Sequence, residues 1–387
     1  MELYIDRLND ELKNILGFWS QYAFYDNHKN IYPEVSNNGT GNLQADTGTI
    51  YMARVLFGIS AAGMHFKTKE YNELAQTAFN ILTGKHKNPE GGYYWGINRK
   101  GDPVHHDTNV SFAQAFVIYG LCEYYNLTHS EKVLSVINNQ IEFIENNLYD
   151  FQAGGYLDGY NVHWKPIEKQ SKSLGTIIHM MEAYSKYLHI RNDENIKIKV
   201  RELLELVLDK IIDKNTYEAF HFFETDWKTK PNENWVGHNM EISWLICETA
   251  GILKDDDLTK RCYDAAINLV EYNLKKGLDN TYGGMYNILK NGMPVTQDKE
   301  YWPQAETAIA LINAFKLTNN KYYLNDTIRL IEFIDGTISD EKTGEWYNSV
   351  EKEGKPIDTP KLHFWKSMYH NVRYCIQMVK RMQELIN

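Results

Sequence analysis

The stretch Gly283–Pro294, which reads GGMYNILKNGMP, decides the fold that this sequence predicts. Its glycine- and aromatic-rich start is typical of a short strand, and its Asn-Gly turn uses glycine to supply a positive φ. Comparable fragments recur about every 60 to 65 residues along the chain. They start at Ile31, Gly91, Gly154, Ala219, Gly283 and Gly344. The sequence therefore predicts one unit repeated six times.

Two helix-period segments follow most of these fragments. The first is apolar on nearly all sides, as in Tyr51–Ala62, Ser111–Tyr125, Leu174–Leu188, Met240–Ala250, Ala305–Leu317 and Tyr369–Met382. The second carries a polar stripe, as in Tyr71–Leu82, Glu131–Asn146, Lys197–Ile212, Asp257–Leu274 and Tyr322–Asp335. The first kind is expected on the inside of an assembly of helical pairs and the second on its outside.

Six such helical hairpins can close into an all-α (α/α)6 barrel, with Leu3–Tyr22 supplying the missing outer helix. An open superhelix of helical pairs is the alternative, but the aromatic residues gathered at one end of every repeat favour closure. No linker rich in proline, serine or glycine interrupts the series, so residues 1–387 are expected to form a single domain.

The amino-acid composition favours some classes of ligand and argues against others. The 9 Trp, 27 Tyr and 15 Phe exceed what a helical core needs, and aromatic faces stack on sugars. A net charge of −10 without a basic block argues against nucleic acid. The N-terminus has no signal-like pattern and no long apolar run follows, so a soluble, cytoplasmic protein without membrane contact is expected. Four scattered cysteines indicate neither a disulfide framework nor a zinc knuckle. The expected partner is a small sugar, and the expected state is a monomer or homodimer.

Polar residues at the starts of the apolar helices would meet at one mouth of a closed ring. The candidate catalytic residues are Arg54, His179, His238, Glu241 and His370. The candidate sugar contacts are Gln114, Glu306 and the aromatic residues Tyr51, Phe112, Trp302 and Trp365. His238 and Glu241 stand at i and i+3 on one helix face. A carboxylate there would orient the imidazole for acid/base work, while capping and metal binding are the alternatives.

Arg54 interrupts an apolar helix, so it needs an anionic partner, for which Glu241, Glu306 or a developing oxyanion are the options. Serine, cysteine and nucleotide motifs are missing from the sequence. What remains is proton transfer by histidines on a neutral substrate, which suits abstraction of a proton α to a carbonyl.

Six segments carry a resemblance to a known family: Ala45–Leu56, Ala113–Tyr119, His179–Tyr184, Gly237–Trp244, Trp302–Glu306 and Trp365–Arg373. Together they resemble the N-acylglucosamine 2-epimerase superfamily, and within it the cellobiose 2-epimerases most closely. The resemblance implies an (α/α)6 barrel without metal or redox cofactor. It also implies that His238 and His370 flank C2 of an opened sugar, with Arg54 and His179 near the oxygens of a cis-enediolate.

Two histidines on opposite faces of C2 give epimerisation, whereas one histidine moving the proton from C2 to C1 gives aldose–ketose isomerisation, and both outcomes stay open. A glycoside hydrolase using Glu241 and Glu306, or a non-catalytic sugar-binding protein, are further alternatives. Phe112, Gly175 and the short loop 164–171 depart from the disaccharide epimerases, which have a tyrosine, an asparagine and a longer loop there. The sugar is therefore open between monosaccharide and disaccharide.

Overall fold

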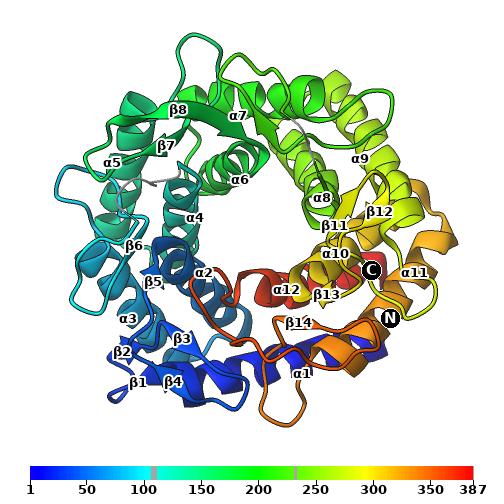
Figure 1. The fold of residues 1–387 in the computed structure, drawn as a ribbon, viewed down its shortest axis with the longest axis horizontal. Coiled ribbons are helices and arrows are strands. Elements are labelled where there is room, and N and C mark those ends of the chain that lie inside the picture. Colours follow the sequence, from blue (N-terminus) through cyan, green and yellow to red (C-terminus); the bar gives the residue numbers. More distant parts are fainter. Residues whose placement is uncertain (106–110, 231–232, 387) are drawn as a thin grey trace.

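Six helices line the inside of a ring and six cover its outside in the part of the chain that the computed structural model describes, residues 1–105, 111–230 and 233–386 (Figure 1). The inner helices are α2 (Thr49–Phe66), α4 (Ser111–Thr128), α6 (Leu174–Ile190), α8 (Val236–Leu253), α10 (Tyr301–Thr318) and α12 (Tyr369–Ile386). The outer helices are α1 (Glu2–Phe18), α3 (Lys69–Lys85), α5 (Glu131–Asn147), α7 (Glu194–Leu206), α9 (Asp256–Gly277) and α11 (Lys321–Phe333). The predicted (α/α)6 barrel is confirmed.

Burial follows the predicted division between inner and outer helices. In α2 every residue from Thr49 to Gly63 is buried, because this helix packs on neighbours all round. Helix α5 buries only Val133, Ile137, Gln140 and Ile144, which share one face. Three outer helices, α1, α7 and α11, end in π-helical turns at Trp19–Ala23, Val207–Ile211 and Ile334–Ile338. No helix of the described residues has both the length and the apolar character to cross a membrane.

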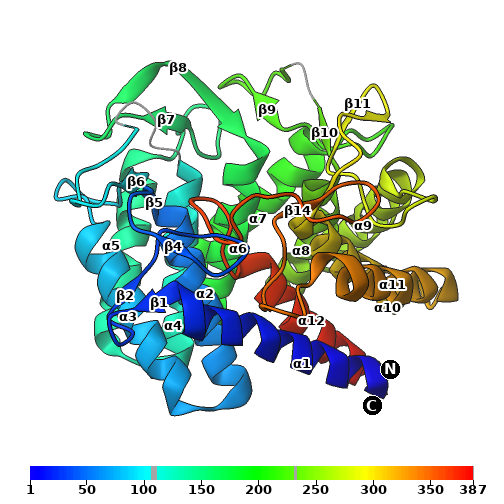
Figure 2. The same cartoon turned by 60° about the horizontal axis from the view of Figure 1, so that its bottom comes forward.

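Short antiparallel strands gather at the end of the ring where the inner helices begin (Figure 2). They are β1 (Phe24–Tyr25), β2 (Asn30–Ile31), β3 (Glu34–Val35), β4 (Gly41–Asn42), β5 (Thr47–Gly48), β6 (Gly96–Ile97), β7 (Asp158–Tyr160), β8 (Pro166–Ser173), β9 (Phe222–Phe223), β10 (Asn234–Trp235), β11 (Ile288–Lys290), β12 (Met293–Pro294), β13 (Lys299–Glu300) and β14 (Ser349–Val350). The strand before an inner helix pairs with the strand of the next repeat, as β5 does with β6, β8 with β9, β10 with β11 and β13 with β14. The strands therefore tie neighbouring repeats together above the inner helices.

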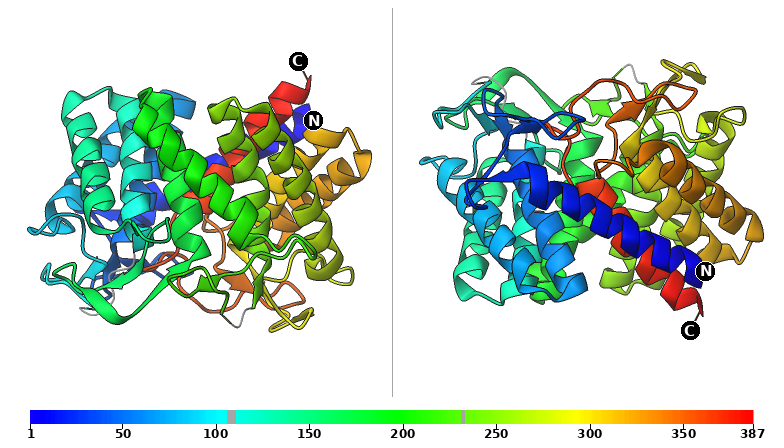
Figure 3. Two further views of the ribbon diagram at one scale, coloured as in Figure 1. Left: turned by 90° about the horizontal axis from the view of Figure 1, so that it is seen from above. Right: turned by 90° about the horizontal axis from the view of Figure 1, so that it is seen from below.

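The two ends of the chain close the ring. Val35, in the first repeat, pairs with Leu362, which precedes the last inner helix, through backbone hydrogen bonds of 2.9 and 3.1 Å. Helix α1 packs against α12, and the two termini lie close together (Figure 3). The last inner helix is therefore covered by the first helix of the chain.

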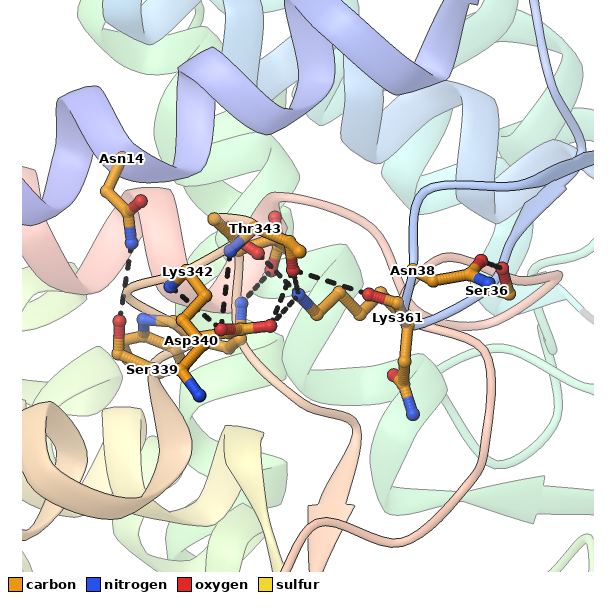
Figure 4. Close-up of polar contacts among 12 residues, drawn as sticks. Asn14, Ser36, Asn38, Ser339, Asp340, Lys342, Thr343 and Lys361 are labelled. Carbon is orange, nitrogen blue, oxygen red and sulfur yellow. Dashed lines mark hydrogen bonds and ion pairs between the residues drawn. The ribbon is translucent and has the colours of Figure 1, made fainter.

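Buried lysine–aspartate pairs fix the loops at the strand-bearing end. The Lys361 ammonium lies 2.7 Å from the Asp340 carboxylate and also donates to the Thr343 hydroxyl and the Gly344 carbonyl (Figure 4). Thr343 in turn donates to the Asn37 carbonyl across the closing seam. Equivalent pairs, Lys172 with Asp150 and Lys299 with Asp279, recur in two other repeats at 2.7 and 2.9 Å. These lysines are almost fully buried, so each needs its carboxylate partner.

Two glutamines hold the glycine-rich fragments onto the inner helices. Gln304 accepts from the Met285 backbone N–H at 2.7 Å and donates to its carbonyl at 2.9 Å. Gln114 does the same with Tyr93, at 3.0 and 2.8 Å. Just before Met285, Gly284 has φ +74°, and a Cβ there would lie 2.5 Å from Phe333. The conformation of this fragment therefore requires glycine.

Candidate active site

Polar residues from five inner helices meet at the strand-bearing end of the ring. They stand in the first two turns of α2, α6, α8, α10 and α12, which is the regular placement that a closed ring imposes on its repeats. Arg54, His179, Glu241, Glu306 and His370 are each at most 7% exposed. The structure thus brings together most of the residues that the sequence singled out, within an otherwise apolar interior.

The guanidinium of Arg373 holds the carboxylates of this cluster together. One terminal nitrogen donates to Glu182 and is in contact with the Tyr369 hydroxyl. The other donates to Glu241 and, at 2.7 Å, to Glu306. Burial alone would raise the pKa of the Glu182 carboxyl, but Arg373 is the main influence that lowers it to about 2. Three carboxylates can therefore be buried together because one cation serves them all.

Two of the three clustered histidines bond a carboxylate through Nδ1. The Nδ1 atom of His370 lies 2.6 Å from Glu306, and that of His179 lies 3.1 Å from Glu182. Since a carboxylate only accepts, each of these imidazoles carries its proton on Nδ1 when neutral. Each Nε2 atom then carries a lone pair that can accept a proton.

His238 is held differently from what the sequence suggested. Its Nδ1 lies 3.0 Å from Nε2 of His221, whereas Glu241 is paired with Arg373. The expectation that Glu241 orients His238 directly is therefore wrong. The ring of His238 contacts two indoles: it stacks on Trp235 with centroids 5.5 Å apart and is tilted against Trp302 with centroids 4.9 Å apart.

Arg54 is a buried cation without a carboxylate partner among the described residues. One of its terminal nitrogens donates to the Trp365 carbonyl at 3.0 Å, and its guanidinium lies over the rings of Phe116 and Tyr369, at 4.2 and 4.8 Å. The two carboxylates considered as its partners, Glu241 and Glu306, bond Arg373 instead. Neither carboxylate option considered for Arg54 is therefore realised.

Aromatic rings surround the approach to the cluster. Phe112 packs 5.3 Å from His179 and 6.3 Å from Trp365, which is 48% exposed. Trp302 contacts both histidine rings, with its ring centroid 4.9 Å from that of His238 and 5.4 Å from that of His370. Next to Trp365 a groove of about 850 Å³ opens, lined by aromatic and polar residues that include Trp95, Phe364, Asp46, Asn348 and His363. Phe112, Trp302 and Trp365 therefore contact the histidines of the cluster or one another.

Tyr51 and Gln114 do not reach the cluster, so their prediction as substrate contacts is withdrawn. Tyr51 is fully buried, its hydroxyl donates to the Tyr32 carbonyl at 2.8 Å, and its ring packs on Trp19. Gln114 is fully buried and bonded to the Tyr93 backbone. Both residues stabilise the barrel.

Burial sets the protonation of the histidines. It lowers the pKa of both His238 and His370 well below the usual value, and the nearby Glu241 carboxylate opposes this in each case. His221 lowers the pKa of His238 further. Burial also raises the pKa of Glu306 and lowers that of Arg54. Neutral imidazoles, the form needed in a base, are therefore favoured at neutral pH.

Spacing alone would allow a metal ion in this cluster. The ligand atoms of His179, His238 and Glu241 lie within 4.8 Å of one another, and so do those of Glu241, Glu306 and His370. However, Glu241 and Glu306 already bond the guanidinium of Arg373, which takes the place of a metal between them. The donor set is better matched to proton transfer than to metal binding.

Several residues of the site escaped prediction from the sequence, among them Glu182, His221 and Tyr369. Glu182 follows His179 by three residues, the same spacing as His238 and Glu241, and that signal could have found it. His221 comes from the segment before β9, far from any helix start, and nothing in the sequence links it to His238.

Oε2 of Glu241 is buried and has no hydrogen-bond partner in the described part of the chain, so it can accept from a ligand hydroxyl.

Comparison with known proteins places these features in a family context. The sequence profile of N-acylglucosamine 2-epimerase matches residues 31–373. A cellobiose 2-epimerase from Bacteroides fragilis is 29% identical over 376 residues, covering 94% of this chain and 95% of that protein. A D-mannose isomerase from Marinomonas mediterranea is 24% identical, covering 87% and 89%. The structure of cellobiose 2-epimerase from Bacillus thermoamylovorans superposes with a TM-score of 0.92 at 26% identity, covering 98% and 100%.

Proposed function

The chain belongs to the N-acylglucosamine 2-epimerase family and is a carbohydrate epimerase or isomerase. We propose that it interconverts C2 epimers of an aldose. The aldose is a free sugar or the reducing end of a longer one, of the glucose/mannose type. Proton transfer through a cis-enediolate, with His238 and His370 as the acid/base pair, accounts for the site geometry. Residues 1–387 act as one catalytic domain in this proposal.

One observation supports the proposal: His238 and His370, from different helices, both contact the indole of Trp302, and both offer a nitrogen within 4.8 Å of an oxygen of Glu241. Neither Nε2 is taken up by the contacts described above, since each Nδ1 has its own partner. A sugar carbon between the two imidazoles can lose a proton to one and gain a proton from the other.

The remaining residues have roles that follow from charge. After the pyranose ring opens, loss of the C2 proton places negative charge on the sugar oxygens. Arg54, a buried cation without a carboxylate, stabilises that charge, and His179 lies beside it near Phe116. Glu241 accepts a sugar hydroxyl through its unpartnered oxygen. Trp302 and Trp365 supply stacking surfaces for the sugar.

A longer sugar would extend into the groove beside Trp365. Phe112 lacks a hydroxyl, and a Cβ at Gly175 would meet only Phe112, at 3.9 Å, so this side of the site offers room but no donor. Recognition beyond the reacting sugar therefore falls to the groove. Similarity to a cellobiose 2-epimerase supports a disaccharide, and a free aldose remains the simpler substrate.

Aldose–ketose isomerisation is the second candidate, because this chain is also similar to a D-mannose isomerase over most of its length. It needs one histidine rather than two. Glycoside hydrolysis fits less well, since it needs two carboxyl groups as acid and base. Glu306 bonds Arg373, His370 and Trp244, and Glu241 is ion-paired with Arg373.

Proton NMR in D2O tests the proposal on a panel of aldoses and β-linked disaccharides. The expected result is deuterium at C2 as the epimer appears, whereas isomerisation would give a ketose labelled at C1. His370→Asn should leave C2 exchange in one epimer only, without net epimerisation, because His238 then removes and returns the proton on one face. Absence of exchange with every sugar would refute both candidates.

A further inference from the structure

His221 reaches the site from outside the inner helices. It precedes β9, is 4% exposed, and places Nε2 3.0 Å from Nδ1 of His238. Its ring packs against Trp235 at 5.4 Å, the same indole on which His238 stacks. The backbone on each side is fixed, because the His221 carbonyl accepts from the Leu174 N–H and β9 pairs with β8. The imidazole is thus held rigidly against His238.

The proton positions along this contact follow from the role of His238. An imidazole that takes a proton from a sugar at Nε2 carries its own ring proton on Nδ1. In His238 that nitrogen lies 3.0 Å from Nε2 of His221, so His238 donates and His221 accepts. Neutral His221 then has its lone pair at Nε2 and its proton on Nδ1.

We propose that His221 is a positioning residue for proton transfer by His238: it holds His238 in the Nδ1–H tautomer and leaves Nε2 as the base that addresses the sugar. This inference rests on the proposed function, in which His238 acts on C2. It assigns to a neutral imidazole the orienting role that Glu306 has for His370 and Glu182 has for His179.

Because His221 is a neutral partner, His238 and His370 also differ in how well their protonated forms are stabilised. A carboxylate stabilises an imidazolium far better than a neutral ring does, so a proton shared by the pair resides on His370 rather than on His238. His238 is then the base and His370 the acid when epimerisation starts on the His238 face. The ionisable groups that face His238 are His221, Glu241 from α8, His179 from α6 and His370 from α12. Those that face His370 are Glu241, Glu306, Arg54, Arg373, His179 and Tyr369.

Three substitutions of His221 in the full chain separate the orienting role from a packing role. His221→Phe keeps the aromatic contact with Trp235 but removes the acceptor. His221→Gln keeps an amide oxygen as acceptor near the position of Nε2. His221→Glu supplies a carboxylate. His65→Gln is the matched control, because His65 lies near the far end of α2 and contacts Asn9.

The first readout needs no substrate. Two-bond 1H–15N spectra of the 15N-histidine-labelled protein report the tautomer of each imidazole, and the His238 signals are assigned by their loss in His238→Asn. Wild type, His221→Gln and the His65 control should show the Nδ1–H tautomer of His238, and His221→Phe should show a mixture. An Nε2–H tautomer in wild type, or an unchanged tautomer in His221→Phe, would overturn the proposal.

The second readout is kinetic. In His221→Phe, kcat should fall about 10- to 100-fold with KM nearly unchanged, as part of the contribution of a general base, and His221→Gln should restore most of it. In His221→Glu the acid limb of the pH–kcat profile should move up by about 1 unit or more, because a carboxylate favours the imidazolium. If no sugar undergoes exchange, the proposed function fails, while the tautomer measurement still decides the role of His221. Wild-type kcat in His221→Phe together with a wild-type pH profile in His221→Glu would refute that role.

Discussion

Arg54→Met should remove most of the turnover and leave the stability of the fold nearly unchanged. Arg373→Met should lower both turnover and stability. The two arginines are buried in the same pocket to 7 and 2% exposure, but their partners differ. Arg373 serves three carboxylates, and Arg54 only a backbone carbonyl and two aromatic rings. The same substitution at the two positions therefore distinguishes an arginine that neutralises buried carboxylates, Arg373, from one that acts in the reaction, Arg54.

The magnitudes follow from those contacts. Methionine at position 54 loses one hydrogen bond and two cation–π contacts, but it also ends the desolvation of an unpaired cation, so the free energy of unfolding should stay within about 1 kcal/mol of wild type. Loss of a group that stabilises an oxyanion should lower kcat about 10²- to 10³-fold. Methionine at position 373 leaves buried carboxylates uncompensated and should destabilise the fold by about 3–5 kcal/mol.

The loss in the Arg373 variant should also depend on pH. The folded-state pKa of Glu182 is about 2, below its ordinary 4.5, so the stability it contributes is present above about pH 4.5 and disappears as pH falls towards 2. Urea unfolding at pH 7.5 and pH 4, with NMR turnover assays beside it, measures all of these quantities. Equal losses of stability in both variants, or wild-type kcat in Arg54→Met, would refute the assignment of Arg54 to the reaction.

Gln114→Ala should lower the unfolding free energy by about 2 kcal/mol through the lost bonds to Tyr93, with KM unchanged; a raised KM would restore Gln114 to the substrate site. Glu306→Gln should remove the carboxylate that stabilises the protonated form of His370 and reduce kcat about tenfold or more, with KM nearly unchanged; wild-type kcat would contradict His370 as the acid. Burial raises the pKa of Glu11 from 4.5 to about 7, so its ionised form destabilises the fold increasingly as pH rises from 4.5 to 7. Glu11→Gln should therefore stabilise the protein at pH 8 by up to about 3 kcal/mol but not at pH 4, as thermal unfolding at the two pH values would show.

The repeat and the helices could be read from the sequence because their signals are local. Inner helices predicted at Ala305–Leu317 and Tyr369–Met382 extend in the structure to Tyr301–Thr318 and Tyr369–Ile386. Glycine pairs and apolar periodicity depend on neighbours in the chain, so they fix the units without knowledge of how the ring closes. The gathering of Arg54, His179, His238 and His370 then follows from closure alone.

The direction of individual side chains could not be read in the same way. An inner helix is buried all round, so it has no polar stripe to show which face looks towards the axis. Tyr51 and Arg54 stand three residues apart on α2, yet the first bonds Tyr32 and the second lies over Phe116 and Tyr369. Likewise, whether Glu241 meets His238 or Arg373 depends on competition among groups from four helices, which no single segment encodes.

The packing of α1 against α12 makes the reaction depend on residues that never approach the sugar. His370 and Arg373 stand on α12, and α1 covers this helix. Removal of α1 would thus disturb proton transfer from a distance. A circular permutant that joins the neighbouring termini and opens the chain elsewhere should, by contrast, keep the two histidines in register.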